Sequence, residues 1–216
     1  MKKTACEKIL WLALAPSSLA FIRKAWKDIP LRQVKKQAKA NYTAMVNRTP
    51  DIGPYRANPL RLCLAGGMVW LSIFDAMDGK MTSEDFGKMI QSTLEASWLK
   101  ALLSRQNRFS RRAQEKSYRQ TLRANAASDS AFNWQAEVRL GRDENEYTMI
   151  FHQCGLCALG RQEGHEDLIP YMCQLDFAMI DLAGGCLKRT GTLATGADCC
   201  DFYIYKKGSK WDDASP

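Results

Sequence analysis

Residues 134–151 read WQAEVRLGRDENEYTMIF, and this stretch decides the fold class. Its apolar residues alternate with polar neighbours on both sides of a polar segment at 141–145. Alternation with period two is typical of strands that have one buried face, and a short polar segment between two such runs predicts a β-hairpin. The alternating apolar residues are Trp134, Ala136, Val138 and Leu140 in the first run and Tyr147, Met149 and Phe151 in the second.

The part of the chain before this hairpin shows helical spacing. Residues 31–46 form a basic amphipathic stretch, and 59–76 form a long apolar one whose Gly66-Gly67 pair permits close helix packing. A third helix is predicted from Thr82, a favourable N-cap, to residue 96, and 98–103 continue the apolar helical layer.

After the hairpin, helical spacing returns at 167–182, and two further strands are predicted at 186–193 and 200–205, joined by a turn around Gly196. The C-terminal half therefore reads strand, strand, helix, strand, strand. We expect an α+β fold in which a helical N-terminal layer packs on a small antiparallel sheet.

One domain suits a chain of 216 residues. We expect an N-terminal helical extension at 1–30, a single α+β domain at 31–210 and a tail at 211–216.

The N-terminus has the outline of a secretory signal peptide, because two lysines precede the apolar run 9–15. Glu7 and Lys8 stand where the apolar region should begin, which favours an amphipathic helix and a cytoplasmic protein. No segment reaches the roughly 18–20 apolar residues of a membrane span, so we expect no such span.

The composition is that of a globular protein, with 46% hydrophobic and 25% charged residues. The net charge of +8 gathers largely in 23–39 and 105–123. The second segment has few aromatic residues and no recognition motif, so we expect a surface helix without a specific nucleic-acid partner. Binding of nucleic acid through these basic helices is a weaker alternative.

Eight cysteines would suit a disulfide framework in a short secreted chain. Here the chain is longer, and Cys199 and Cys200 are adjacent. We therefore expect mostly reduced thiols.

The last third of the chain carries the residues that can do chemistry. Cys173 and Asp176 are three apart on the predicted helix and share a face. Arg189, on the next predicted strand, points inward beside Leu187 and needs a partner there, because an unpaired buried charge is costly. Cys200 lies on the same face of the last predicted strand as the inward-facing residues, so we expect its thiol to point toward the core. Each has an ordinary interpretation: a buried cysteine acts as a small hydrophobe, and Asp176 can simply be the salt-bridge partner of Arg189.

Cys154-Gly-Leu-Cys157 has the C-x-x-C spacing of zinc and redox sites, but no second pair stands at matching spacing. A mixed site from Cys154, Cys173 and Cys200, with Asp176 as a further ligand, is chemically reasonable for zinc or another divalent metal. His165 is interpreted as a solvated loop residue, a general base or ligand being the alternative, and His152 as an outward-facing residue without a role.

These residues resemble the signature of the L-2-amino-thiazoline-4-carboxylic acid hydrolase family. The resemblance rests on Cys154, the C-x-x-D run 173–176, the R-T-x-T-L-A-x-G run 189–196 and the C-D-F run 200–202. It is specific over about fifty residues and extends loosely back toward Asn41. The ending is also similar to 4-vinyl-reductase-type sensor domains, in which cysteines hold zinc.

The hydrolase resemblance implies ring opening of an aminothiazoline carboxylate to an N-carbamoyl cysteine. In that reaction Arg189, with Thr190, would bind the small anionic substrate, Asp176 would position or activate water, and Cys173 or Cys200 would attack or hold a metal. The alternative function is a noncatalytic small-molecule or metal-binding sensor that uses the same cysteines. The oligomeric state is not readable from the sequence.

Overall fold

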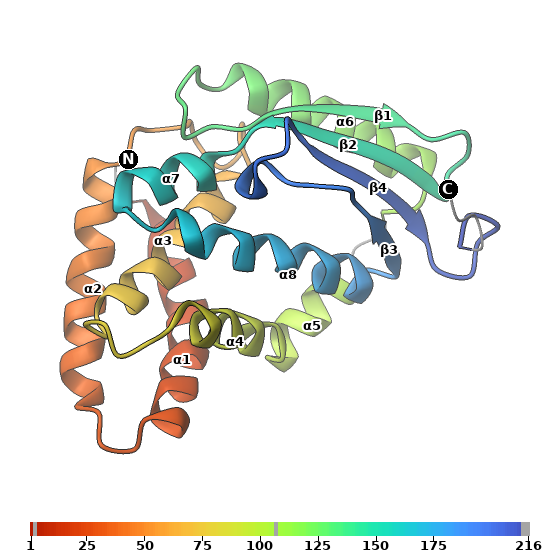
Figure 1. Ribbon diagram of the computed structural model, residues 1–216. Helices are drawn as coiled ribbons and strands as arrows, with labels where there is room; N and C mark the ends of the chain where they lie inside the picture. Colours follow the sequence, from red (N-terminus) through yellow and green to blue (C-terminus); the bar gives the residue numbers. More distant parts are fainter. Residues whose placement is uncertain (2–3, 106–107, 213–216) are drawn as a thin grey trace.

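The computed structural model describes residues 1, 4–105 and 108–212 (Figure 1). Its N-terminal part is helical, as the spacing predicts. The helices there are α1 (Ala5–Ala25), α2 (Leu31–Arg48), α3 (Arg61–Asp75), α4 (Ser83–Leu94), α5 (Ser97–Ser104) and α6 (Arg111–Ala126). The rest of the chain forms β1 (Gln135–Leu140), β2 (Glu146–Gln153), α7 (Gly155–Glu163), a 3-10 turn (Glu166–Leu168), α8 (Ile169–Leu182), β3 (Gly185–Lys188), a second 3-10 turn (Leu193–Thr195) and β4 (Cys200–Lys206).

The four strands form one antiparallel sheet in the order β1-β2-β4-β3. Its register confirms the predicted alternation, because Met149 of β2 lies between Val138 of β1 and Phe202 of β4. Phe151 lies in the same way between Ala136 and Cys200. The α+β fold class, with helices on an antiparallel sheet, is confirmed.

Two predictions of elements were wrong. The third strand ends at Lys188 and does not continue to 193, because the backbone of Thr190 and Gly191 turns aside to donate hydrogen bonds to the Asp201 carboxylate. The helix α7 was not predicted, because it has only nine residues and their apolar positions show little periodicity.

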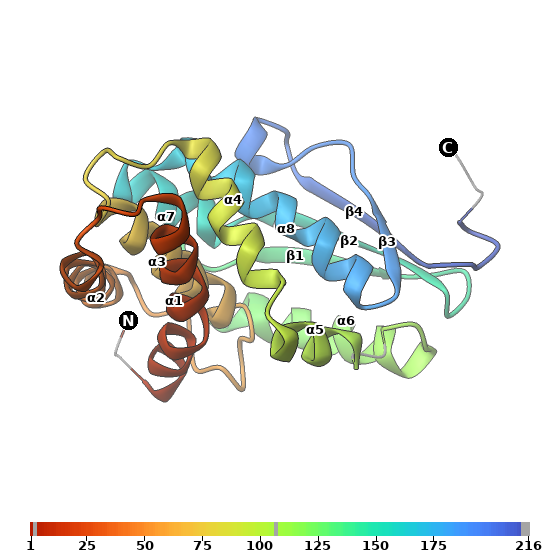
Figure 2. The same ribbon diagram turned by 90° about the horizontal axis from the view of Figure 1, so that it is seen from below.

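The helices are stacked outward from the sheet. Figure 1 shows α8 running along the sheet, with α4 and then α1 beyond it. In Figure 2 the same face of the sheet is seen from below, with α8 in front of it and α6 alongside β1. The core between these helices contains side chains that are completely buried, among them Ile22, Leu64, Met68 and Phe86.

The α1 helix packs into this core and is tied to α3 by a buried ion pair. The Arg61 Nε atom lies 2.7 Å from the Glu7 carboxylate, and these side chains are 2% and 0% exposed. Arg61 also donates to Asp51, at 2.9 Å, and to the carbonyl of Gly53. The expected domain boundary near residue 30 falls in the turn between α1 and α2. Buried side chains of both helices belong to one hydrophobic core.

By length and composition alone, α1 is long and apolar enough to cross a membrane. This corrects the expectation that no segment reaches that length. The reason is that Pro16, Ser17 and Ser18 are uncharged and extend the apolar run that begins at Ile9. A buried core helix and a signal sequence pass the same test, and seven residues of α1 are buried in the structure.

The α6 helix protects the edge of the sheet. The Asn125 side chain exchanges two hydrogen bonds with the backbone of Ala136, as a neighbouring strand would. At the other end, Gln114 accepts from the amide of Gly141 and donates to the carbonyl of Glu146. Because these bonds satisfy backbone groups that would otherwise be unpaired, α6 has a structural role in covering the edge of the sheet. Its expected surface position is confirmed, and its lack of a nucleic-acid partner stays a prediction.

Candidate active site

The cysteines of the C-terminal third come together where β2, α7, α8 and β4 meet. Cys154 directly follows β2, Cys157 lies in the first turn of α7, Cys173 is on α8 and Cys200 begins β4. Their proximity is visible in the electrostatics, because the charges of Cys154, Cys173 and Cys200 all raise the pKa of the Cys157 thiol, after its hydrogen bond to Cys154 and its burial. All eight cysteines of the chain are free thiols.

Cys154 is the N-cap residue of α7, and its sulfur is the acidic one of the group. Its pKa is lowered from 9.0 to about 7, first by a hydrogen bond from the Cys157 thiol and then by the amides of Cys157 and Leu156, against the opposing effect of burial. Amides at the start of a helix point their positive end outward and stabilise a negative sulfur. Of the four clustered thiols, Cys154 is therefore the one whose environment favours the thiolate.

The residue between Cys154 and the rest of α7 must be glycine. A Cβ atom at Gly155 would lie 2.1 Å from the carbonyl oxygen of Phe132 and 2.7 Å from the Trp134 ring. The absence of a side chain lets the helix begin directly against the segment before β1. This contact fixes the position of Cys154.

Cys173 and Cys200, the two nucleophiles expected from the sequence, are protonated at neutral pH. Burial is the largest effect for both, raising the pKa of Cys173 to about 12 and that of Cys200 to about 11. The Cys200 sulfur accepts a hydrogen bond from the amide of Leu193 at 3.2 Å. A fifth thiol, Cys63 on α3, is solvent-exposed, yet desolvation, Asp176 and Cys154 raise its pKa. Cys63 therefore lies close to Asp176 and Cys154.

Asp176 lies on the same face of α8 as Cys173 and is paired with Arg189. The Arg189 Nη1 atom donates to the Asp176 carboxylate at 3.0 Å, and Nη2 donates to the carbonyl of Cys173 at 3.2 Å. Burial raises the pKa of Asp176 to about 6, although Arg189 acts to lower it. The sequence thus correctly predicted the Asp176–Arg189 salt bridge, which was one of its two interpretations.

The rings of Phe177 and Phe202 lie 4.8 and 5.2 Å from the Arg189 guanidinium, whose side chain is only 5% exposed. Thr190 is held similarly, because its hydroxyl donates to the Asp201 carboxylate at 2.6 Å. A hollow of about 260 Å³ lies beside both residues and Cys173. The runs R-T-G-T and C-D-F are therefore joined to each other by Asp201.

A metal centre is not assembled by these side chains. Within 1, 4–105 and 108–212, no group of three or more His, Cys, Asp or Glu residues is arranged to hold a metal ion. The predicted set of Cys154, Cys173 and Cys200 lies together, and burial raises the pKa of Cys173 and of Cys200, so both thiols would have to lose a proton to bind a metal.

The histidines lie away from the thiols. His165 was interpreted as a solvated loop residue, which is wrong: its Nε2 atom lies 2.5 Å from the Asp75 carboxylate, and its ring packs edge-on against Phe74. This pair links the α7–α8 connection to α3, a long-range contact that local sequence does not show. His152 is 56% exposed on β2, as expected.

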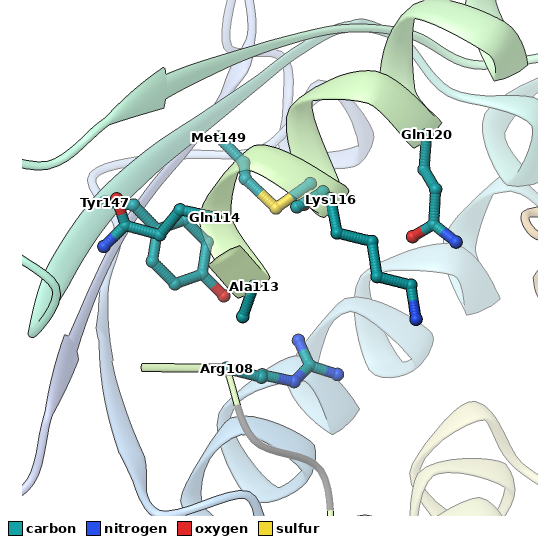
Figure 3. Close-up of a pocket in the computed structure, with 8 residues that line it drawn as sticks. Arg108, Ala113, Gln114, Lys116, Gln120, Tyr147 and Met149 are labelled. Atoms are coloured by element: carbon teal, nitrogen blue, oxygen red, sulfur yellow. The ribbon is translucent and has the colours of Figure 1, made fainter. Parts of the chain in front are cut away.

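A cleft runs along the inner face of the sheet toward this cluster. One hollow of about 400 Å³ lies between α6 and β2, lined by Arg108, Lys116, Tyr147 and Met149 among others (Figure 3). A second, of about 140 Å³, shares Met149 with the first and extends to Phe151, which pairs with Cys200 across the sheet. The second hollow therefore extends to the strand neighbour of Cys200, and no cysteine is among the described residues that line either hollow. Arg108 was not singled out by the sequence, in which it is one of many cations in the basic stretch.

Residues 64–204 match the family model of L-2-amino-thiazoline-4-carboxylic acid hydrolase. The chain belongs to this family. The match covers the segment from α3 to β4 and so includes the hairpin, the thiol cluster of the C-terminal third, Asp176 and Arg189. No curated protein and no solved structure matches the chain. The hydrolase family name agrees with the resemblance found in the signature residues.

The acidity of Cys154 in this hydrolase-family chain can be measured directly. Iodoacetamide reacts with the thiolate, so the rate of alkylation rises as the pH passes upward through the pKa. We expect the Cys154 rate in the native protein to reach half its maximum near pH 7, where its pKa lies. The control is Cys186, near the surface, whose pKa is raised above 9.0 by burial and by Asp212.

Peptide mass spectrometry after brief labelling would follow both residues in one sample. Equal pH dependence of Cys154 and Cys186 would contradict the described environment of Cys154. Labelling after unfolding without reductant also tests the expected reduced state, since all eight thiols should then react. Three or more disulfides would overturn that expectation.

Proposed function

We propose that the chain hydrolyses an L-2-aminothiazoline-4-carboxylate-like substrate to an N-carbamoyl cysteine, with Cys154 as the nucleophile. The observation that carries this proposal is a thiolate at the start of α7 beside a carboxyl group, Asp176, whose pKa burial raises to about 6. A nucleophile and a base that both change protonation near neutral pH suit a hydrolysis in two steps.

In the first step, the Cys154 sulfur attacks the ring carbon that bears the amino group. The bond from that carbon to the ring sulfur breaks, and the ring sulfur leaves as a thiolate. The product of this step is an isothiourea linked to Cys154. Negative charge has moved from one sulfur to the other, so no proton is required.

In the second step, Asp176 takes a proton from water as the water oxygen attacks the same carbon. The bond to Cys154 breaks and the thiolate returns. The second proton of the water moves to the former ring nitrogen, and the carbon becomes the carbonyl of a urea. Asp176 then passes its proton to the substrate thiolate. One water is consumed and the enzyme is regenerated.

Arg189 has a different role in this proposal from the one the sequence suggested. Its guanidinium is held between two aromatic rings and donates to Asp176 and to the carbonyl of Cys173. We assign it to positioning Asp176 and to holding down the pKa that burial raises. Cys173 and Cys200 then line the site as uncharged thiols that do not react. Cys157 stabilises the Cys154 thiolate through its hydrogen bond.

The experiment is to incubate the purified chain with L-2-aminothiazoline-4-carboxylate and to follow new thiol by Ellman's reagent and product by mass. We expect kcat/KM to rise with pH until Cys154 and Asp176 have both lost their protons, at pH values above about 7. An adduct on Cys154 in quenched samples would identify the isothiourea. Binding of the compound without any new thiol would instead favour the noncatalytic sensor.

A further inference from the structure

We infer that the hollow between α6 and β2 binds the carboxylate of the substrate, with Arg108 as the residue that receives it and Lys116 as a second cation. This assignment rests on the proposed function for the identity of the substrate. It moves the anion site from Arg189 to a residue on the opposite side of the cleft.

The first argument is the chemistry of the lining. Arg108 and Lys116 are cationic, Ser117 and Gln120 are neutral hydrogen-bonding residues, and none of the residues that line this hollow within the described chain is acidic. Figure 3 shows the Arg108 guanidinium and the Lys116 amine directed into the same space, near the Gln120 amide. A recess with positive charge and without a carboxylate favours a small anion.

The second argument is that Arg108 acts on the reacting groups. Its charge lowers the pKa of Asp176 and of Cys63, and it also donates a hydrogen bond to the Tyr147 hydroxyl. Because the charge of Arg108 affects the pKa of Asp176, a ligand bound at Arg108 can lie close to Asp176. Its planar fork also matches a carboxylate better than an ammonium does.

The third argument is the position of the hollow on the sheet. Met149 lines both hollows, and Phe151 follows it toward Cys200 along the inner face of the sheet. A flat five-membered ring can lie against Met149 with its carboxylate at Arg108. Arg189 lines a different hollow, and its side chain is 5% exposed and already donates to Asp176 and to the carbonyl of Cys173.

The test combines a substitution in the protein with one in the substrate. Arg108→Gln should raise KM for the carboxylate substrate about 10- to 100-fold with little change in kcat, the range for one lost charge-assisted contact. The substrate in which a carboxamide replaces the carboxylate should lose a similar factor with the wild-type protein. With Arg108→Gln, acid and amide should be used equally well, because the group that distinguishes them is gone.

Arg112→Gln is the matched control, because Arg112 is an exposed cation at the start of α6, four residues after Arg108, and does not line the hollow. It should leave KM unchanged. A wild-type preference for the acid that survives in Arg108→Gln would overturn the inference while leaving the hydrolase proposal intact. If no turnover occurs at all, calorimetric binding of the intact substrate decides instead. If the wild-type protein binds the substrate and Arg108→Gln does not, the anion site is supported although the hydrolase proposal fails. If both proteins bind it with equal affinity, the anion site is overturned too.

Discussion

Replacement of Cys154 by serine should abolish turnover, lowering kcat/KM on the order of 10³-fold or more, while the fold is retained. Serine is smaller and can occupy the same position at the start of α7, but its hydroxyl does not ionise near neutral pH. The measurement is the rate of thiol release from the aminothiazoline carboxylate, with circular dichroism and the melting temperature as checks of folding.

Three further variants make this result specific to Cys154. Cys186→Ser, on the edge strand β3, should keep full activity. Cys173→Ser and Cys200→Ser should reduce activity only moderately, because both are uncharged thiols that do not react in the proposed mechanism. If Cys173→Ser or Cys200→Ser were inactive and Cys154→Ser active, the nucleophile would be one of the residues expected from the sequence.

Replacement of Arg61 by alanine should cause the largest loss of stability, about 3–5 kcal/mol, since it leaves the fully buried Glu7 carboxylate without its partner. For a chain of this size that loss corresponds to a fall in melting temperature of roughly 6–20 °C. Burial raises the pKa of Glu7, but hydrogen bonds from Thr4 and Arg61 outweigh it and the net pKa is lowered. The pair therefore stabilises the fold above the unfolded pKa of Glu7, and this contribution is lost as the pH falls through the folded value.

Thermal unfolding of Arg61→Ala and of Arg56→Ala, an exposed cation on the same segment, provides the comparison. Arg56→Ala should change stability by no more than about 0.5 kcal/mol. The double variant Glu7→Leu with Arg61→Met should recover most of the loss, because replacing both charges by apolar groups removes the desolvation penalty. Equal melting of the Arg61 and Arg56 variants would mean that α1 is not packed as described.

The sequence predicted the fold better than the site, for a physical reason. The hairpin at 134–151 and the helices α2 and α4 have one buried face each, and burial of one face leaves a periodic pattern. The strand predicted at 186–193 failed because the Asp201 carboxylate, ten residues away from Gly191, turns the chain at that point. Such a hydrogen bond depends on the tertiary structure and leaves no period.

The site residues illustrate the same limit. The alternation and the helical spacing were sufficient to bring Cys173, Asp176 and Arg189 together, and the salt bridge followed. The acidity of Cys154 depends on the start of α7, a short helix that the pattern does not reveal, and the place of Arg108 depends on how α6 lies against β2. The sequence could identify the candidate thiols but could not show which of them has the lowest pKa.

The order of strands in the sheet has a consequence for how the chain is synthesised. β4 is the last strand to be made, yet it lies in the interior of the sheet between β2 and β3. Until it emerges, β2 has an open edge, and β3 has no neighbour within the sheet. Cys154 and Asp176 are then already present, but Cys200 and the Asp201 link to the 190–191 turn are not. The nascent protein therefore passes through a stage in which the helical layer can be complete while the site is only half built. A ribosome stalled before residue 200 should hold a chain that is compact at its N-terminus and still open to protease after β2.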